Sequence, residues 1–308
     1  MTTKSPTRAT KIMARGHLRV GLAAKGQLRW AVADLSEIVE AARQRRDLSP
    51  VASVALGQML AGAALILRLQ SKTPVRVILE SQGDGPLGRV TAEADDLGHL
   101  RGSVTVPQAV VPTTGQASEG EGIDSAAGIG KGNLKVIRQM PNITYESVVP
   151  LLDGQGVSQQ LTHFLQQSDQ TQSALLLGVL LRSDGVAAAG GLILEALPGA
   201  DEDLVNTLEG TLSRLPSVSR CLEEKGVDGL LAEVFGELDR KDLESLPLAY
   251  VCTCDRERLR LHLAHLPAED RDHLLEMKEE GQEAGTEVEC NFCGAHYRFS
   301  AEELSIPQ

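Results

Sequence analysis

Aromatic side chains are scarce in this chain, which holds one Trp, three Tyr and four Phe among 308 residues. The core must therefore be aliphatic, and nucleic-acid binding that depends on stacked aromatic rings is disfavoured. Export and membrane signals are also lacking. No apolar run follows the basic residues 1–16, and the apolar segment 51–67 is interrupted by Ser53 and Gln58 and is shorter than the about 20 residues of a membrane span. We expect a soluble cytoplasmic protein with no membrane partner.

Basic residues are outnumbered, and the excess of acid lies in the C-terminal third. The net charge is −12; residues 1–200 carry +2, whereas residues 201–250 and 251–308 carry −7 each. This acidity repels nucleic-acid backbones, and self-repulsion destabilises a compact state. The length is typical of about two domains. We therefore expect no nucleic-acid partner and a C-terminal third of marginal stability.

Cysteine is rare, but four of the five cysteines form two close pairs near the C-terminus. Cys252 and Cys254 form the first pair, Cys290 and Cys293 the second, and residues 255–289 separate them. Structural zinc sites are almost always four-coordinate, and cysteine sulfur binds zinc at about 2.3 Å. Gly294 follows the second pair and can adopt the left-handed conformation of a ligand turn. The pattern predicts one Zn²⁺ held by four thiolates.

Other interpretations of the cysteines are weaker. Two structural disulfides suit an oxidising compartment, and a thioredoxin-like motif requires a βαβ unit that the sequence around Cys290 does not indicate. Histidine is also a zinc ligand, but four cysteines already complete the shell; the nearby histidines are His262, His265, His273 and His296. Each cysteine pair is close enough in sequence to close on itself, so metal and disulfide would be exclusive states. Cys221 lies outside the pattern and is expected to be an inert thiol.

The first two thirds of the chain predict an α+β fold. Strand patterns lie at 18–23, 28–32, 75–81, 89–94, 100–106, 134–139, 175–181 and 186–194. Helices are expected at 34–46 and, beginning with a cap and proline, at 49–69; the second is apolar all round and so buried. Residues 1–16 are expected to be loose, 112–132 to form a loop, and 157–167 to form a helix or a strand. The loop segment Gly-Ile-Gly-Lys-Gly lacks the Walker spacing, which disfavours nucleotide binding.

The C-terminal third predicts short amphipathic helices. They are expected at 203–214, 218–225, 229–238, 256–265 and 268–280. We therefore divide the chain into an α+β core domain (1–198), an amphipathic helical linker (199–249) and a zinc domain (250–308).

Two segments are specific enough to indicate a family. They read Tyr-Val-Cys-Thr-Cys-Asp-Arg-Glu-Arg at 250–258 and Cys-Asn-Phe-Cys-Gly-Ala-His-Tyr-Arg-Phe at 290–299, and residues 173–180 and 189–199 support them. Through these segments the chain resembles the bacterial redox-regulated thirty-three-kilodalton heat-shock chaperone family. The resemblance covers most of the chain, although the spacer between the cysteine pairs is long.

The resemblance implies a non-enzymatic, ATP-independent holdase of the stress response. It implies a reduced, zinc-bound inactive form that oxidants activate, unfolded proteins as clients, and a homodimer on activation. By motif, Cys252, Cys254, Cys290 and Cys293 are both the zinc ligands and the redox-active cysteines. The alternative function is a zinc-ribbon module that binds a protein or nucleic-acid partner. A zinc hydrolase or thiol oxidoreductase is a third possibility, but a catalytic zinc keeps an open position.

The pairing of the disulfides follows from sequence proximity, and their order from the more relaxed geometry of the Cys290–Cys293 spacing. Thiolates are the species that oxidants attack, and short loops close most readily. We expect the local disulfides Cys252–Cys254 and Cys290–Cys293, the second forming first. Local disulfides cannot hold the two halves of the tail together, so the oxidised tail should be less folded than the zinc-bound one.

Overall fold

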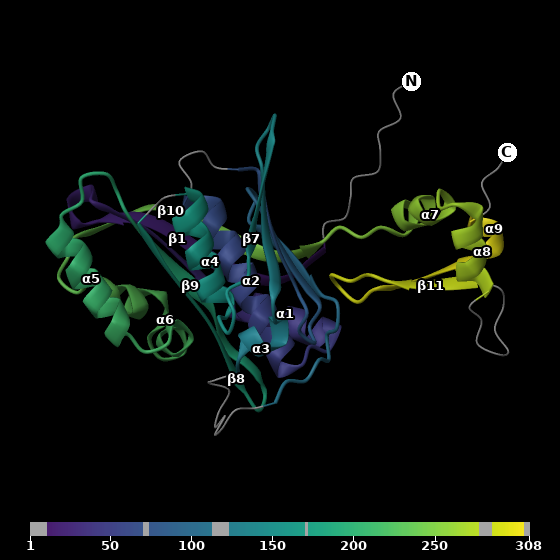
Figure 1. Cartoon of the computed structure of the whole chain (residues 1–308), viewed down its shortest axis with the longest axis horizontal. Helices are drawn as coiled ribbons and strands as arrows, with labels where there is room; N and C mark the ends of the chain where they lie inside the picture. Colours follow the sequence, from purple (N-terminus) through teal and green to yellow (C-terminus); the bar gives the residue numbers. More distant parts are fainter. Residues whose placement is uncertain (1–10, 70–73, 113–122, 170–171, 277–284, 305–308) are drawn as a thin grey trace. The chain divides into compact units, whose positions relative to one another are not determined.

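The computed structural model describes residues 11–69, 74–112, 123–169, 172–276 and 285–304. The chain divides into two compact units, and the division falls between Val251 and Cys252. We call residues 12–251 the sheet unit and the chain from Cys252 onward the tail unit. Both contain strands and helices (Figure 1), which confirms the predicted α+β class.

A ten-stranded sheet forms the centre of the sheet unit. Its strands are β1 (Lys11–Ala23), β2 (Leu28–Asp34), β3 (Arg76–Gly83), β4 (Arg89–Asp95), β5 (His99–Val104), β6 (Gly132–Gln139), β7 (Thr144–Pro150), β8 (Ser173–Arg182), β9 (Gly185–Ala196) and β10 (Arg240–Cys252). The spatial order is β7-β6-β3-β4-β5-β10-β1-β2-β9-β8. Two antiparallel groups, β7 to β5 and β1 to β8, are therefore joined by β10.

Two helical layers cover opposite faces of the sheet. One face packs on α1 (Ser36–Arg46), α2 (Pro50–Leu69), α3 (Ser125–Ile129) and α4 (Val157–Phe164); the other packs on α5 (Glu202–Arg214) and α6 (Val218–Phe235). Neighbouring strand residues alternate between the two cores. Ala31 and Ile193 lie in the core under α2, whereas Trp30 and Leu192 lie in the core under α6. The period-2 alternation of strand side chains explains this division.

Helix α2 is the central core helix. The helix has 20 residues, and an 18-residue stretch of it has a mean hydropathy of 1.8, so it is long and apolar enough to cross a membrane, but 89% of that stretch is buried inside the protein. The cap is as expected, because the Ser49 hydroxyl accepts from the Ala52 amide. The prediction of a helix at 49–69 that is buried all round is confirmed.

Most predicted elements of residues 12–199 are confirmed, and the differences are local. The β1–β2 and β8–β9 hairpins form as expected. The expectation that residues 11–16 are loose is wrong, because β1 begins at Lys11. Residues 125–129 form α3 inside the expected loop, whose residues 113–122 lie outside the described residues. The undecided segment 157–167 begins as helix α4, and β7 was not anticipated.

The segment predicted as a helical linker is helical only in part. Helix α6 is interrupted at Gly226, which has φ 65° and ψ −171°, so the expected separation into two short helices is confirmed. Residues 240–249 are not helical: they belong to β10 and lie in the sheet. Charged residues dominate 239–244, and pairing with neighbouring strands, not local pattern, makes this segment extended.

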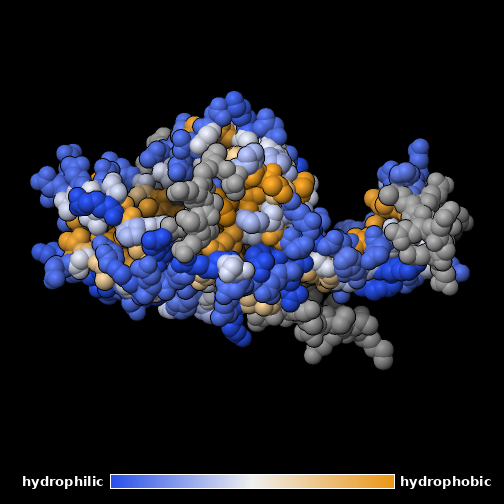
Figure 2. All heavy atoms as spheres, turned by 90° about the horizontal axis from the view of Figure 1, so that it is seen from below, coloured by the Kyte–Doolittle hydropathy of each residue, from blue (hydrophilic) through white to orange (hydrophobic). Residues whose placement is uncertain are grey.

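Helix α5 is loosely packed. Only Leu208 of this helix is buried, while Leu204 and Leu212 are partly buried. A cleft of about 370 Å³ lies between α5 and the sheet, lined in part by Leu28, Leu194 and Leu212. Figure 2 shows hydrophobic residues of the sheet unit exposed between hydrophilic ones on one face. The sheet unit therefore carries apolar surface that its own helices cover incompletely.

The tail unit is built on a two-stranded hairpin. Strands β11 (Gly285–Glu289) and β12 (His296–Ser300) pair antiparallel, beside α7 (Arg256–Ala264), α8 (Ala268–Glu276) and α9 (Ala301–Leu304). The two predicted helices are confirmed up to Glu276, the last described residue before 285; the hairpin was not anticipated. The Arg256 guanidinium lies 4.7 Å over the Phe299 ring and bonds to the Glu303 carboxylate at 2.9 Å.

Candidate metal centre

The four predicted cysteines lie at two chain turns of the tail unit. Cys252 is the last residue of β10, and Cys254 precedes α7, whose first turn is capped by the Asp255 carboxylate. Cys290 follows β11 and Cys293 lies in the turn before β12. In this turn the Gly294 amide donates to the Cys290 carbonyl at 2.8 Å.

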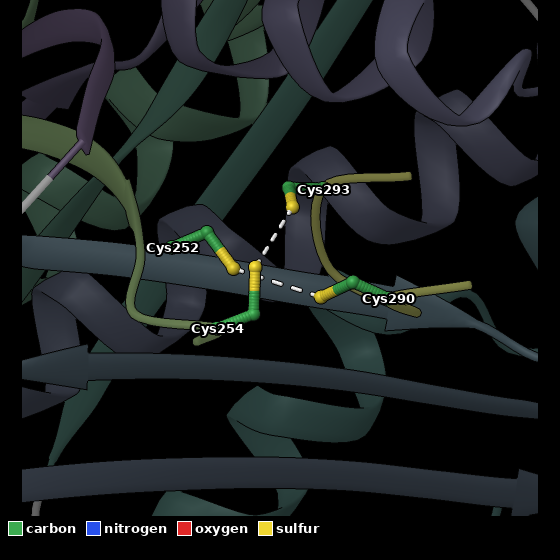
Figure 3. A group of neighbouring side chains, drawn as sticks. All are labelled: Cys252, Cys254, Cys290 and Cys293. Atoms are coloured by element: carbon green, nitrogen blue, oxygen red, sulfur yellow. Dashed lines mark hydrogen bonds between the residues drawn. The ribbon is translucent and has the colours of Figure 1, made fainter. Parts of the chain in front are cut away.

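Gly294 has φ +68°, the left-handed conformation expected for it from the sequence. A side chain would strain this position. The turn therefore depends on glycine and directs the Cys290 and Cys293 sulfurs toward the first pair, as Figure 3 shows.

The four Sγ atoms form one cluster and lie within 4.8 Å of one another. Two short separations join the two pairs: Cys252 to Cys290 at 3.6 Å and Cys254 to Cys293 at 3.4 Å (Figure 3). Sulfurs at about 2.3 Å from a shared zinc ion are about 3.8 Å apart in a tetrahedron. The donor set and its spacing fit a four-coordinate metal ion.

The two sides of the cluster differ in exposure. Cys252 and Cys290 are buried, whereas Cys254 and Cys293 are half-buried. A soluble oxidant therefore reaches Cys254 and Cys293 more easily. The accessible pair contains one cysteine from each sequence motif.

A hydrogen bond within the cluster shifts the pKa values of Cys252 and Cys290 in opposite directions. The bond from Cys252, followed by the Cys293 and Phe292 amides, lowers the pKa of Cys290 to about 4 despite its burial; the same bond raises the pKa of Cys252. Burial raises the pKa of Cys293 to about 11. Thiols that keep their protons must lose them to bind a metal, so metal affinity will depend on pH.

A tyrosine also contacts the cluster, and the sequence analysis missed it. The Tyr297 hydroxyl lies 3.0 Å from the Cys254 sulfur, and this contact raises the pKa of the phenol. Tyr297 is four residues after Cys293 and sits on β12 opposite Val288. Only the β11–β12 pairing, which was not anticipated, turns its side chain toward the sulfurs.

The histidines considered from the sequence have other neighbours. His296 Nδ1 lies 2.8 Å from the Glu287 carboxylate, and His265 Nδ1 lies 2.6 Å from the Leu261 carbonyl. His262 contacts Arg258, and His273 lies on α8. In the part of the chain that the structure describes, the potential metal-ligand group consists of the four cysteines.

The fifth cysteine is remote from this group in sequence and in environment. Cys221 lies on α6, buried in the core under that helix. Burial raises the pKa of its thiol. A protonated, buried thiol is a poor nucleophile, as expected of an inert cysteine.

Comparison with known proteins decides the family. Residues 16–300 match the family described as Hsp33 protein. The chain belongs to the Hsp33 family. A "33 kDa chaperonin" of Thermus thermophilus is 39% identical over 303 residues, covering 94% of this chain and 85% of the relative. The "33 kDa chaperonin" of Latilactobacillus sakei is 32% identical over 283 residues, covering 91% of this chain and 94% of the relative.

A solved structure agrees in fold. The Hsp33 homologue of Thermotoga maritima has a TM-score of 0.81 and 31% identity, covering 95% of this chain and 96% of its own. The family resemblance stated from the sequence is thus confirmed. The relatives are named 33 kDa chaperonin, so a chaperone function is supported for this chain. Its four close cysteines could hold a metal ion.

Proposed function

We propose that this chain is a redox-regulated, ATP-independent holdase, inactive when reduced and zinc-bound. The observation that supports it best is the sulfur cluster, which brings together the two cysteine pairs on either side of the spacer 255–289. A metal held there ties together a segment that has little core of its own. The same thiolates are the groups that an oxidant attacks. Metal binding and oxidant sensing therefore share the same four side chains.

We assign Cys252, Cys254, Cys290 and Cys293 as the ligands of one Zn²⁺. The four thiolates would complete the coordination shell of a bound zinc ion, and its binding would contribute much of the folding free energy of the tail. A closed shell leaves no position for substrate, which favours a structural site over a hydrolytic one. The three parts proposed from the sequence, 1–198, 199–249 and 250–308, then act as core, linker and sensor.

Oxidation removes the ligands in pairs. Peroxide attacks one thiolate to give a sulfenic acid and hydroxide, and a second thiolate displaces a further hydroxide from that sulfur to form a disulfide. Each disulfide thus passes two electrons from its two sulfurs to one peroxide, and a disulfide sulfur no longer binds the metal, so zinc is released. The resting cluster places cross-pair sulfurs closest; we still propose Cys252–Cys254 and Cys290–Cys293 as the products, because short loops close first once the tail loosens.

Loss of the tail fold extends to the linker. Helices α5 and α6 cover an apolar sheet face that includes Trp30, Val32, Leu192 and Leu194. Loosened helices would expose part of this face, and exposed apolar surface binds non-native chains. The same surface explains why activation would favour a homodimer. We infer a cytoplasmic role during heat or oxidative stress, when clients unfold.

An aggregation assay tests this function. A thermally unfolding client is mixed with reduced, zinc-loaded protein or with peroxide-treated protein, and light scattering is followed. We expect suppression only after peroxide treatment, one zinc released per chain, and the two local disulfides in peptide maps. Equal suppression in both states would contradict redox control. Cross-pair disulfides with a tail still protected from hydrogen exchange would contradict the proposed route.

A further inference from the structure

Strand β10 occupies an unusual place in the sheet. It follows α6 in sequence, yet lies between β5 and β1 and is the strand through which the two antiparallel groups are continuous. Helix α2 packs on both groups, touching β3, β4 and β5 in one and β2, β8 and β9 in the other. Both groups thus keep a shared support without β10. If β10 left its position, the two groups would therefore remain attached through α2.

The N-terminal half of β10 is held mainly by polar contacts at the surface. Residues 240–245 are exposed. Arg19 of β1 bonds to the Asp242 carboxylate at 2.5 Å, and Arg68 of α2 lies 3.6 Å from Glu244. His17 Nε2 lies 2.8 Å from the Ser245 hydroxyl. Exposed ion pairs stabilise by about 0–1 kcal/mol each, so apart from its main-chain pairing in the sheet this half has little stabilisation from side chains.

The C-terminal half is anchored by alternate apolar side chains. Leu248 and Tyr250 are buried in the core under α2, and Leu246 packs against that core. The Tyr250 hydroxyl donates to the Gly102 carbonyl at 3.3 Å. Pairing with β5 is short, with Ala249 opposite His99 and Tyr250 opposite Leu100. Cys252, a metal-ligand candidate, lies two residues after Tyr250. The buried side chains that anchor β10 are therefore next to the sulfur cluster in sequence.

We propose that the position of β10 between β5 and β1 is the client-binding slot of the activated protein, and that β10 is an internal placeholder for the client. The proposal rests on the proposed function and specifies its partner: an extended segment of a non-native chain with apolar side chains at every second position. When β10 leaves, β5 and β1 each present an unpaired edge, which is a template for another strand. Strand addition satisfies such edges by main-chain hydrogen bonds, and side-chain pockets set preference.

The side chains of β10 indicate which client segments fit. The sites of Leu246, Leu248 and Tyr250 lie at successive alternate positions on the core side. The Tyr250 site accepts a whole aromatic ring and offers the Gly102 carbonyl as an acceptor. Main-chain pairing is independent of sequence, whereas these sites favour aliphatic and aromatic side chains. Such segments are buried in folded proteins and become available on unfolding.

A covalent tether tests the slot directly. His99 and Ala249 are register partners on neighbouring strands and are both half-buried, so cysteines at these positions lie within disulfide reach. The double variant His99→Cys, Ala249→Cys, oxidised with peroxide, keeps β10 in the sheet. We expect normal zinc release and the two local disulfides of the oxidised tail. We also expect that about tenfold more protein is needed to suppress client aggregation equally, which corresponds to a loss of about 1.4 kcal/mol in client binding.

A matched tether controls for the added disulfide. Thr91 and Ser103 are register partners within the β4–β5 pair, which the proposal leaves intact. Thr91→Cys, Ser103→Cys should suppress aggregation as well as oxidised wild type, as should the single variants His99→Cys and Ala249→Cys. Full suppression by the β10-tethered protein overturns the slot. Absence of suppression by oxidised wild type instead overturns the proposed function.

A peptide gives a readout that does not depend on the tether. A fluorescently labelled peptide of residues 244–251, Glu-Ser-Leu-Pro-Leu-Ala-Tyr-Val, should bind the oxidised protein, compete with client and not bind the reduced form. The same peptide with Leu248→Asp and Tyr250→Asp should bind at least about tenfold more weakly. No peptide binding to an oxidised protein that suppresses aggregation overturns the proposal. An oxidised dimer that excludes the peptide also overturns the proposal, because β10 of the second copy, and not a client segment, would then occupy the slot.

Discussion

Side chains around the sulfur cluster act on individual cysteines. Tyr297 contacts Cys254 at 3.0 Å, and a hydrogen bond from a neighbouring group stabilises a thiolate ligand and tunes its metal. Cys254 is also one of the two half-buried sulfurs. The phenol therefore lies where it can reduce both loss of the metal and attack by an oxidant.

Tyr297→Phe should weaken zinc binding by about tenfold, the lower end of the effect of removing such a group. It should also speed the oxidation of Cys254. Competition with a chromogenic chelator measures the affinity, and timed alkylation with mass spectrometry measures the oxidation. Tyr145→Phe, at an exposed position of β7, is the matched control. Unchanged affinity and oxidation rate in Tyr297→Phe would show that the contact has no such role.

Cys221→Ser should leave zinc binding and oxidative activation unchanged. The thiol is buried on α6, and burial raises its pKa, so it is a poor target for peroxide at neutral pH. Zinc titration and the aggregation assay before and after peroxide provide the measurement. A variant that binds zinc but is no longer activated would mean that the linker itself contains a sensor.

At the scale of elements, one carboxylate ties helix α1 to the β8–β9 hairpin. Glu40 accepts from the Arg43 guanidinium at 2.8 and 2.7 Å and from the Val186 amide at 2.9 Å. The bond from Arg43 is the main reason why the pKa of Glu40 falls to about 2. Since the folded-state pKa is below the ordinary value of 4.5, the ionised carboxylate stabilises the fold above that value, and the gain is lost as pH falls toward 2.

Glu40→Gln should lower the free energy of unfolding of the sheet unit by about 1.5–3 kcal/mol at neutral pH, the size of hydrogen bonds to a charged group. The difference from wild type should shrink as pH falls through about 4 to about 2. Urea denaturation followed by circular dichroism measures it. Glu37→Gln changes an exposed residue of the same helix and should have little effect. A difference that is constant across this pH range would contradict the assigned cause.

Elements with strong local patterns were predictable from the sequence, and elements made by distant pairing were not. Helix α2 has an apolar sequence that alone predicts a buried helix, and the turn at Asp184 and Gly185 marks the β8–β9 hairpin. The first residues of β10 are charged and exposed, so only their place beside β1 makes them a strand. The cysteine ligand group was predictable from spacing, whereas Tyr297 depends on a hairpin whose strands have five residues each.

At the scale of the whole molecule, the two units differ in how much core they have. The sheet unit contains two large apolar cores. Among the described residues of the tail unit, the buried apolar side chains are Cys252, Ala264, Cys290, Phe299 and Leu304. Two of these five are metal-ligand candidates. So small a core rarely stabilises a fold without a metal or another cross-link.

Removing zinc from the reduced protein should therefore unfold the tail unit and loosen the linker (199–249), while the core domain stays folded. The expected loss is large because structural zinc sites contribute about 10–16 kcal/mol in small domains. Hydrogen exchange with and without a strong chelator, read over 252–304, over 199–249 and over 12–198, provides the measurement. Zinc added back in excess is the control for reversibility. A tail that stays protected without metal would show that its fold does not depend on the sulfur cluster.

The position of the single tryptophan gives the molecule a natural optical signal. Trp30 is fully buried under α6, with its ring 6.2 Å from that of Phe235. An indole emits at shorter wavelength in an apolar setting than in water. Departure of α6 would thus shift the emission toward the red. Emission spectra recorded during peroxide treatment can therefore time the release of the linker in the unlabelled, unmutated protein.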